Sequence, residues 1–119
     1  MRWSLRSGIP AVGQVAATGI FTQDASGNIT GTQTRSLNGS VADETFTGTA
    51  TVNSDCTGTD SIQVFQDGSL VRTTTLHVVY DDNGREARAI FTSLVLPNGV
   101  SLPSIITIEA RKLFSREAD

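Results

Sequence analysis

The sequence has few of the residues that mark common catalytic and metal sites. Among its 119 residues there is one cysteine, Cys56, and one histidine, His77. A single cysteine excludes an internal disulfide and the paired or fourfold thiolates of structural zinc sites. The Gly-x-Ser-x-Gly segment of one large hydrolase class is also absent. We therefore expect no metal and no cofactor, and a catalytic triad is disfavoured.

Long apolar runs and clusters of positive charge are also lacking. Nine Lys and Arg against twelve Asp and Glu give a net charge of −3, and no basic cluster could neutralise a run of phosphates. Nucleic acid is therefore not an expected partner. The apolar runs are far shorter than the roughly 20 residues of a transmembrane helix, so no membrane span is expected. The basic start at residues 1–6 precedes no apolar stretch, so we expect no signal peptide in this chain, and its localisation stays open.

The length and the apolar content predict one folded domain. Hydrophobic residues make up 38% of the chain and charged residues 18%, which is typical of a chain that buries a core. We expect one domain over residues 1–119. Within it, residues 1–13 would be an edge strand or poorly ordered, and residues 114–119 a frayed tail.

The strongest positive signal is two-residue alternation, interrupted at short intervals by Gly, Asn and Asp. It predicts strands over residues 14–22, 29–37, 44–52, 59–65, 70–80, 85–96 and 104–113, with residues 3–6 a candidate for one more short edge strand. Tight turns join these segments, and parallel pairing would need crossovers of a dozen or more residues. So many strands without covering helices should curl or split into two sheets. We predict an all-β antiparallel up-and-down meander of seven or eight strands that closes into a small β-barrel.

Two segments of the chain resemble a known group. Residues 48–59, GTATVNSDCTGT, resemble the GTYTVNxDCTGT signature of a group of small uncharacterised bacterial proteins, many of them exported. Residues 24–32, DASGNITGT, resemble the DGxGNITGT hairpin of the same group. The expected meander is similar to the calycin and allene-oxide-cyclase type of barrel. That resemblance implies either a carrier of small hydrophobic molecules or a cyclase.

A barrel would offer its lumen or its mouth to a small apolar molecule. The expected lining residues are Phe21, Phe46, Phe65 and Phe91. Strands that are apolar on both faces, at residues 76–80 and 89–96, indicate that part of the outer surface is covered. We therefore expect a homodimer.

A few polar residues are candidates for catalysis or for binding. His77, Tyr80 and Glu109 could steer protons in a cyclase or isomerase, although an ordinary strand histidine is the favoured interpretation of His77. Glu109 lies on the opposite face of its strand from Ile108, which favours a solvated position. Arg35 and Gln33, on one face of their strand, pose the same choice between a solvated face and the cavity.

Three functions are consistent with these features. A binding module for a small apolar molecule is slightly favoured, because no metal, phosphate or nucleophile motif is present. A cyclase or isomerase is the first alternative, since such pockets need few conventional catalytic groups. A structural or interaction domain with a filled lumen is the second. Whether the lumen is hollow would separate the last from the other two.

Overall fold

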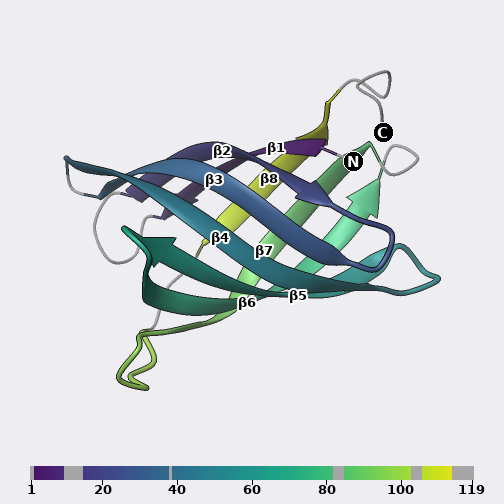
Figure 1. Ribbon diagram of the computed structural model, residues 1–119. Coiled ribbons are helices and arrows are strands. Elements are labelled where there is room, and N and C mark those ends of the chain that lie inside the picture. Colours follow the sequence, from purple (N-terminus) through teal and green to yellow (C-terminus); the bar gives the residue numbers. More distant parts are fainter. Residues whose placement is uncertain (1, 10–14, 38, 82–84, 103–105, 114–119) are drawn as a thin grey trace.

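The described residues of the protein form eight β-strands (Figure 1). The computed structural model describes residues 2–9, 15–37, 39–81, 85–102 and 106–113. The strands are β1 (Arg2–Ile9), β2 (Val15–Gln23), β3 (Asn28–Leu37), β4 (Ser40–Val52), β5 (Thr57–Gln66), β6 (Ser69–Asp81), β7 (Glu86–Val95) and β8 (Thr107–Lys112). Within the described ranges, no helix has the length and apolar character needed to cross a membrane.

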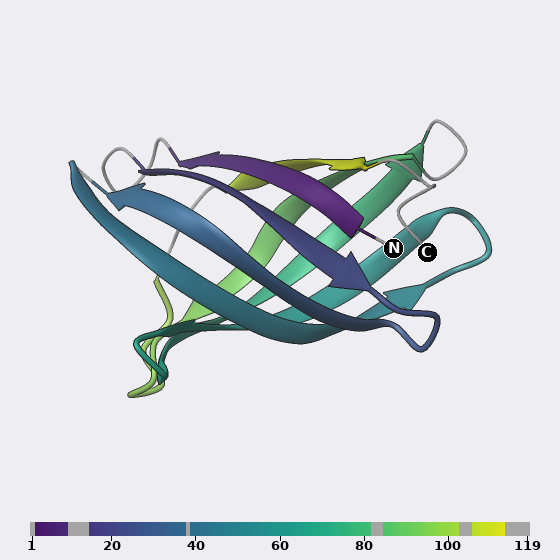
Figure 2. The same ribbon diagram turned by 45° about the horizontal axis from the view of Figure 1, so that its top comes forward.

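The strands form a closed barrel in sequence order (Figure 2). Each strand pairs antiparallel with the next, and β1 pairs with β8 to complete the ring. The predicted fold class is therefore confirmed. The expectation that residues 3–6 form an edge strand is wrong, because Trp3 of β1 pairs with Phe21 of β2 and with Lys112 of β8. Closure removes the two sheet edges that an open meander would expose.

The limits of β2, β3, β5, β6 and β7 lie within two residues of the predicted ones, and the largest difference is at one hairpin. β4 begins at Ser40, four residues before the predicted Glu44, and Ser40 pairs directly with Leu37 across the turn. Gly39 in that turn has a φ of 88°, the left-handed conformation that glycine adopts without strain. Residues 1 and 10–13 of the expected N-terminal segment, residues 104–105 of the last predicted strand and the tail at 114–119 lie outside the described residues.

One glycine makes room for two aromatic rings inside the barrel. Gly31 of β3 pairs with Phe21 on one side and with Phe46 on the other. A Cβ atom at Gly31 would lie 2.5 Å from Phe21 Cβ and 2.5 Å from Phe46 Cζ. The two rings meet with their centroids 6.2 Å apart and their planes at 56°. This tilted arrangement is a favourable one for an aromatic pair.

A β-bulge decides which residues of β7 face inward. The register between β6 and β7 shifts after Thr75, so that Ser93 pairs with Thr75 and Phe91 pairs with Leu76. The extra residue changes the phase of the alternation. Phe91 before the bulge and Leu94 after it both line the interior, although they are an odd number of residues apart. The bulge explains why the sequence of this strand is apolar in both phases.

The core forms a layer around the inner wall of the barrel. One cluster is centred on Leu76, Val78 and Ala87, and another on Ile29, Phe46 and Val64. Partly buried residues pack against both clusters and connect them: Phe21, Ile62, Ile108 and Ala110. The apolar interior is thus continuous around the barrel axis.

Candidate functional site

The barrel encloses a cavity of about 290 Å³. This volume is about twice that of an apolar cavity of about 150 Å³ that holds benzene. It also lies at the lower end of the range for small-molecule pockets, which begins near 300 Å³. Most of the wall is apolar and includes Phe21, Ile62, Leu76, Phe91 and Ile108. The lumen is therefore hollow and mainly apolar.

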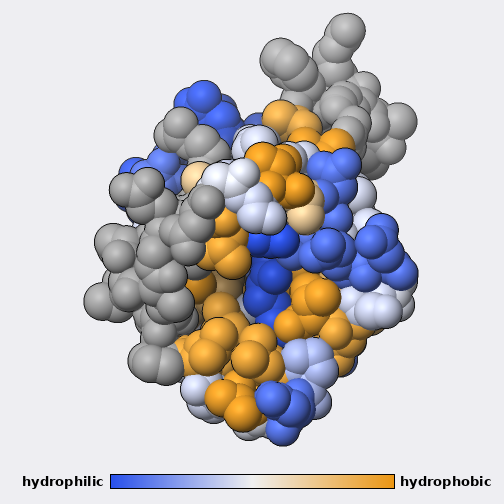
Figure 3. Space-filling model, turned by 90° about the vertical axis from the view of Figure 1, so that its left-hand side faces the viewer, coloured by the Kyte–Doolittle hydropathy of each residue, from blue (hydrophilic) through white to orange (hydrophobic). Residues whose placement is uncertain are grey.

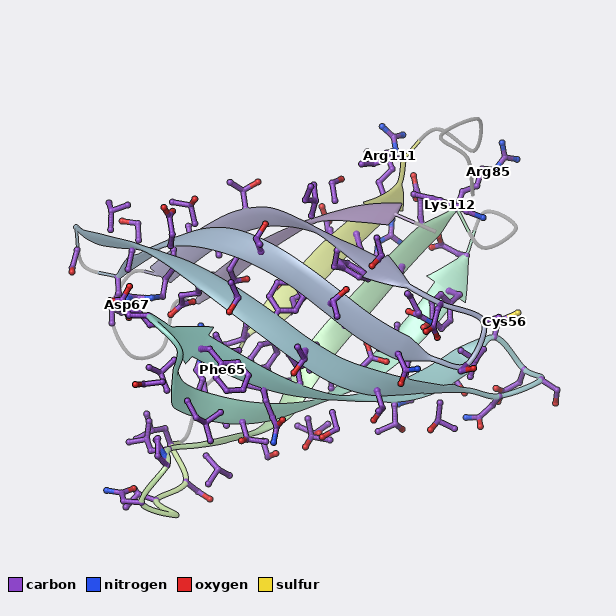
Figure 4. All side chains as sticks on the ribbon, viewed as in Figure 1. Cys56, Phe65, Asp67, Arg85, Arg111 and Lys112 are labelled. Carbon is purple, nitrogen blue, oxygen red and sulfur yellow. The ribbon has the colours of Figure 1, made fainter. Side chains whose placement is uncertain are left out.

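Polar side chains reach the cavity in two groups near opposite ends of the barrel. Six lining residues carry a charged group, an amide or a phenol: Gln23, Gln33, Arg35, Asp60, Arg72 and Tyr80. Figure 4 shows the two ends, with Asp67 of the β5–β6 turn at one end and Cys56 of the β4–β5 turn at the other. One polar group lies toward the Asp67 end and the other toward the Cys56 end.

Toward the Asp67 end, four side chains form a hydrogen-bonded group that we call the Glu44 cluster: Gln33, Arg35, Glu44 and Arg72. Arg72 binds the Glu44 carboxylate with two hydrogen bonds, Nη2 to Oε1 at 2.7 Å and Nη1 to Oε2 at 3.0 Å. Arg35 Nε donates to Oε2 at 3.0 Å, and Gln33 Nε2 donates to Oε1 at 2.8 Å. Both carboxylate oxygens are thus doubly satisfied. Figure 3 looks onto this end, where hydrophilic residues lie in a hollow between hydrophobic ones.

The partners of Glu44 outweigh the cost of burying its charge. The side chain of Glu44 is 1% exposed, and this burial by itself raises the pKa of the carboxyl group. The hydrogen bonds from Arg72 and Gln33, the charge of Arg72 and the hydrogen bond from Arg35 lower it more. The net pKa therefore lies below the usual value of 4.5. Glu44 is a stably ionised, fully partnered carboxylate.

Toward the Cys56 end, Asp60 of β5 faces the cavity beside Tyr80 of β6. The Asp60 Oδ1 atom is buried and has no hydrogen-bond partner among the described residues. Burial raises the pKa of the Asp60 carboxyl group from 3.8 to about 6. Burial and the charge of Asp60 also raise the pKa of the Tyr80 phenol, which a hydrogen bond with Gln23 partly offsets. The mainly apolar wall therefore contains a carboxyl oxygen that has no partner in the described part of the chain.

The structure separates the residues predicted from the sequence into two sets. Phe21, Phe46, Phe91 and Tyr80 line the cavity. Phe65, His77 and Glu109 are not part of that lining. Phe65 is half-buried on β5, one residue after the inward-facing Val64, whereas His77 and Glu109 are exposed on β6 and β8.

For Gln33 and Arg35, the choice that the sequence leaves open falls to the cavity side. Both side chains line the cavity and donate hydrogen bonds to Glu44. Strand β3 places them in phase with Ile29, which is 2% exposed. A run of polar residues on an inner face is stable here because Glu44 of the neighbouring strand satisfies their donors.

Sequence reasoning missed Glu44, Asp60 and Arg72. A signal was present for Asp60, because it precedes Ile62 and Val64 in the same two-residue phase, and those two side chains face inward. Glu44 likewise precedes Phe46 by two residues. Arg72 likewise precedes Thr74 and Leu76 in the same two-residue phase of β6, and those two residues line the cavity.

The described residues contain no group of three or more His, Cys, Asp or Glu side chains that could hold a metal ion. The site is defined instead by a hollow apolar lumen and two buried carboxyl groups in different environments. The protein is thus a closed, eight-stranded, up-and-down β-barrel with an internal cavity.

Known proteins are similar to this chain in fold rather than in sequence. No protein-family model matches the sequence, and no curated protein matches it. A solved structure with the same fold is that of a redesigned beta barrel, mFAP1, bound to DFHBI. The TM-score is 0.61 at 13% sequence identity, with 93% of this chain and 92% of that chain covered. At this identity the likeness concerns the barrel fold alone.

Proposed function

We propose that this protein binds a small, mainly apolar molecule in the lumen of its barrel. The observation that carries the proposal is the hollow apolar interior of about 290 Å³. A barrel of eight strands can be filled completely by its own side chains, so an open lumen is a specific feature of this sequence. It disfavours the alternative of a structural domain with a filled interior.

The aromatic residues of the lumen are the proposed ligand contacts. Phe21 and Phe46 form one tilted pair, and Phe91 lies on β7 in the same cavity wall. Aromatic and aliphatic walls with few polar groups are typical of small-molecule sites. The redesigned barrel mFAP1, which is similar in fold, was solved bound to DFHBI, which supports the use of such a lumen for a small ligand.

The resemblance to small bacterial proteins with the GTYTVNxDCTGT signature stays a proposal, as does the assignment to the calycin or allene-oxide-cyclase type of barrel. Both are compatible with a closed meander that carries a ligand inside. Neither adds a ligand identity.

A fluorescent binding experiment tests the proposal. The neutral dye 1-aminonaphthalene, which is small enough for a cavity of about 290 Å³ and brightens in an apolar environment, is titrated with the wild type and two variants. Ala89→Phe places a ring in the lumen and should abolish the fluorescence increase, because Ala89 lines the cavity. Ala16→Phe adds the same ring at an exposed position of β2 and should leave it unchanged. No binding by the folded wild type, or equal binding by Ala89→Phe, would contradict binding in the lumen.

A cyclase or isomerase is the second candidate, and Asp60 beside Tyr80 is the observation that favours it. A carboxyl group with a pKa of about 6 can accept and return a proton near neutral pH. These two residues are the acid–base candidates inside the cavity, whereas His77 and Glu109 are exposed. An Asp60→Asn variant that keeps ligand affinity but loses turnover of the same ligand would favour catalysis over binding.

Self-association through the outer wall also stays a proposal. Val79 of β6 and Ile90 of β7 are 44% and 45% exposed on neighbouring strands. An exposed apolar surface of this kind is often covered by a partner. Light scattering during size-exclusion chromatography measures the mass in solution. A dimeric wild type and a monomeric Ile90→Lys variant are the expected results, and a monomeric wild type contradicts the proposal.

A further inference from the structure

We propose that the ligand of the lumen carries a protonated amine, and that this amine binds the Asp60 carboxylate at the Cys56 end of the cavity. The inference rests on the proposed binding function and names the chemistry of the ligand. It assigns to Asp60 the role of the polar anchor that orients an otherwise apolar molecule.

The first argument is the missing partner of Asp60. Its Oδ1 atom is buried without a hydrogen bond in the described part of the chain. Buried polar groups in folded proteins are nearly always satisfied, and an exception calls for an explanation such as a ligand. The adjacent strand partners of Asp60 are Ala50 and Leu76, which offer no polar side chain.

The second argument is that the cations that line the lumen are engaged elsewhere. Among the described residues of the cavity wall, the positively charged ones are Arg35 and Arg72, and both bind Glu44. Arg72 pairs with Val64, four residues along β5 from Asp60. At about 3.3 Å per strand residue, this separation is roughly 13 Å. A cation for Asp60 must therefore come from outside the described wall.

The third argument concerns the charge state of the site. With a pKa of about 6, Asp60 is mostly ionised at pH 8, whereas a primary amine is protonated there. Tyr80 is the titratable neighbour from β6, and its pKa is raised above 10, so it stays neutral. Gln23 of β2 is uncharged. An ammonium group would meet one carboxylate and no competing cation from these elements.

The cavity also limits the size of the ligand. A cavity of about 150 Å³ holds the six carbons of benzene, so about 290 Å³ accommodates about a dozen non-hydrogen atoms. The proposed class is therefore a lipophilic amine with a chain or ring system of that size.

Matched probes of equal chain length test the inference: decylamine, decanol and decanoate. Their affinities are measured by calorimetry at pH 8, with circular dichroism to verify folding. We expect decylamine to bind at least about tenfold more tightly than decanol, and decanoate more weakly than decanol. Asp60→Asn should keep the decanol affinity and remove the preference for the amine. Asp43→Asn, which changes an exposed carboxylate on β4, should keep the preference.

The pH dependence of the wild type supplies a test that needs no variant. Because Asp60 titrates at about pH 6, about one molecule in eleven is ionised at pH 5, so decylamine should bind about tenfold more weakly than at pH 8. The decanol affinity should change little. Decanol binding without a preference for the amine, or a preference that survives in Asp60→Asn, would overturn the inference and leave the binding function standing. Failure of all three probes to bind the folded protein would overturn both.

Discussion

The carboxyl groups of Glu44 and Asp60, on neighbouring strands of the barrel, differ in their hydrogen-bond partners. Glu44 accepts hydrogen bonds from Gln33, Arg35 and Arg72, and its pKa is lowered. Asp60 has a buried oxygen without a partner among the described residues, and its pKa is raised to about 6. Burial acts in the same direction on both groups. The hydrogen-bond partners therefore decide whether such a carboxyl group stays ionised or titrates near neutral pH.

This difference assigns different roles to the two ends of the barrel. Two guanidinium groups and an amide fix Glu44 in one geometry, so the Glu44 cluster holds β3, β4 and β6 together. Asp60 gains no comparable stabilisation, and its unpaired charge costs folding free energy. A carboxyl group kept in a destabilising position is available to a ligand.

Removing the charge of Glu44 should produce the largest effect. Glu44→Gln leaves Arg35 and Arg72, whose side chains are 14% and 20% exposed, without an anion. We expect the free energy of unfolding to fall by about 3–5 kcal/mol at pH 7, as measured by urea denaturation. The neighbouring exposed variant Asp43→Asn is the control and should change it by less than about 0.5 kcal/mol. A loss below about 1 kcal/mol for Glu44→Gln would show that the cluster contributes little.

Removing the charge of Asp60 should have the opposite sign. The folded-state pKa of about 6 lies above the usual value of 3.8, so the native state binds more protons and stability falls as the pH rises between these values. Asp60→Asn should therefore stabilise the protein by about 1–3 kcal/mol at pH 8, after solvent screening is taken into account. The gain should vanish at pH 3.5. Urea denaturation at both values measures it, and a destabilised variant at pH 8 would contradict an unpartnered Asp60.

Combining the two variants tests whether the ends act independently. Glu44 lies six residues along β4 from Ala50, the strand partner of Asp60, which is a separation of roughly 20 Å along the strand. Stability changes at such a separation usually add within about 0.5 kcal/mol. We expect the Glu44→Gln and Asp60→Asn double variant to equal the sum of the single changes in urea denaturation at pH 8. A larger coupling free energy would mean that the Glu44 cluster influences Asp60 across the lumen.

Changing His77 should have the smallest effect. His77 is exposed on β6 and does not line the cavity. His77→Ala should alter the free energy of unfolding by less than about 0.5 kcal/mol and leave the affinity for the dye unchanged. Fluorescence titration with 1-aminonaphthalene, which is small enough for the cavity, measures the affinity, with Asp60→Asn for comparison. A clear loss of dye binding in His77→Ala would show that this histidine contributes to the binding site.

The sequence predicted the fold better than the site. Alternating segments separated by Gly, Asn and Asp located seven of the eight strands, because side-chain direction in a strand has a period of two. The same rule places Phe21 and Phe46 inward. Phe65 does not line the cavity, because it follows the inward-facing Val64 by one residue. In β7 the bulge opposite Thr75 shifts the inward phase between Phe91 and Leu94, which alternation alone does not reveal.

The site was harder to predict because it depends on contacts between distant residues. Gln33 and Arg35 look solvated until Glu44 is known to face them across the β3–β4 pair. Arg72 contacts Glu44 from 28 residues away. The sequence of β5 shows Asp60 in phase with Ile62, but not that its carboxyl group lacks a partner.

The amino-acid sequence by itself determined the all-β class, the antiparallel order and most strand positions, because alternation and turn chemistry are local properties. Only the tertiary structure decided that β1 closes the ring against β8, that the lumen is hollow, and which buried carboxyl group is paired. These features depend on the register between strands that are distant in sequence. Local patterning does not encode that register.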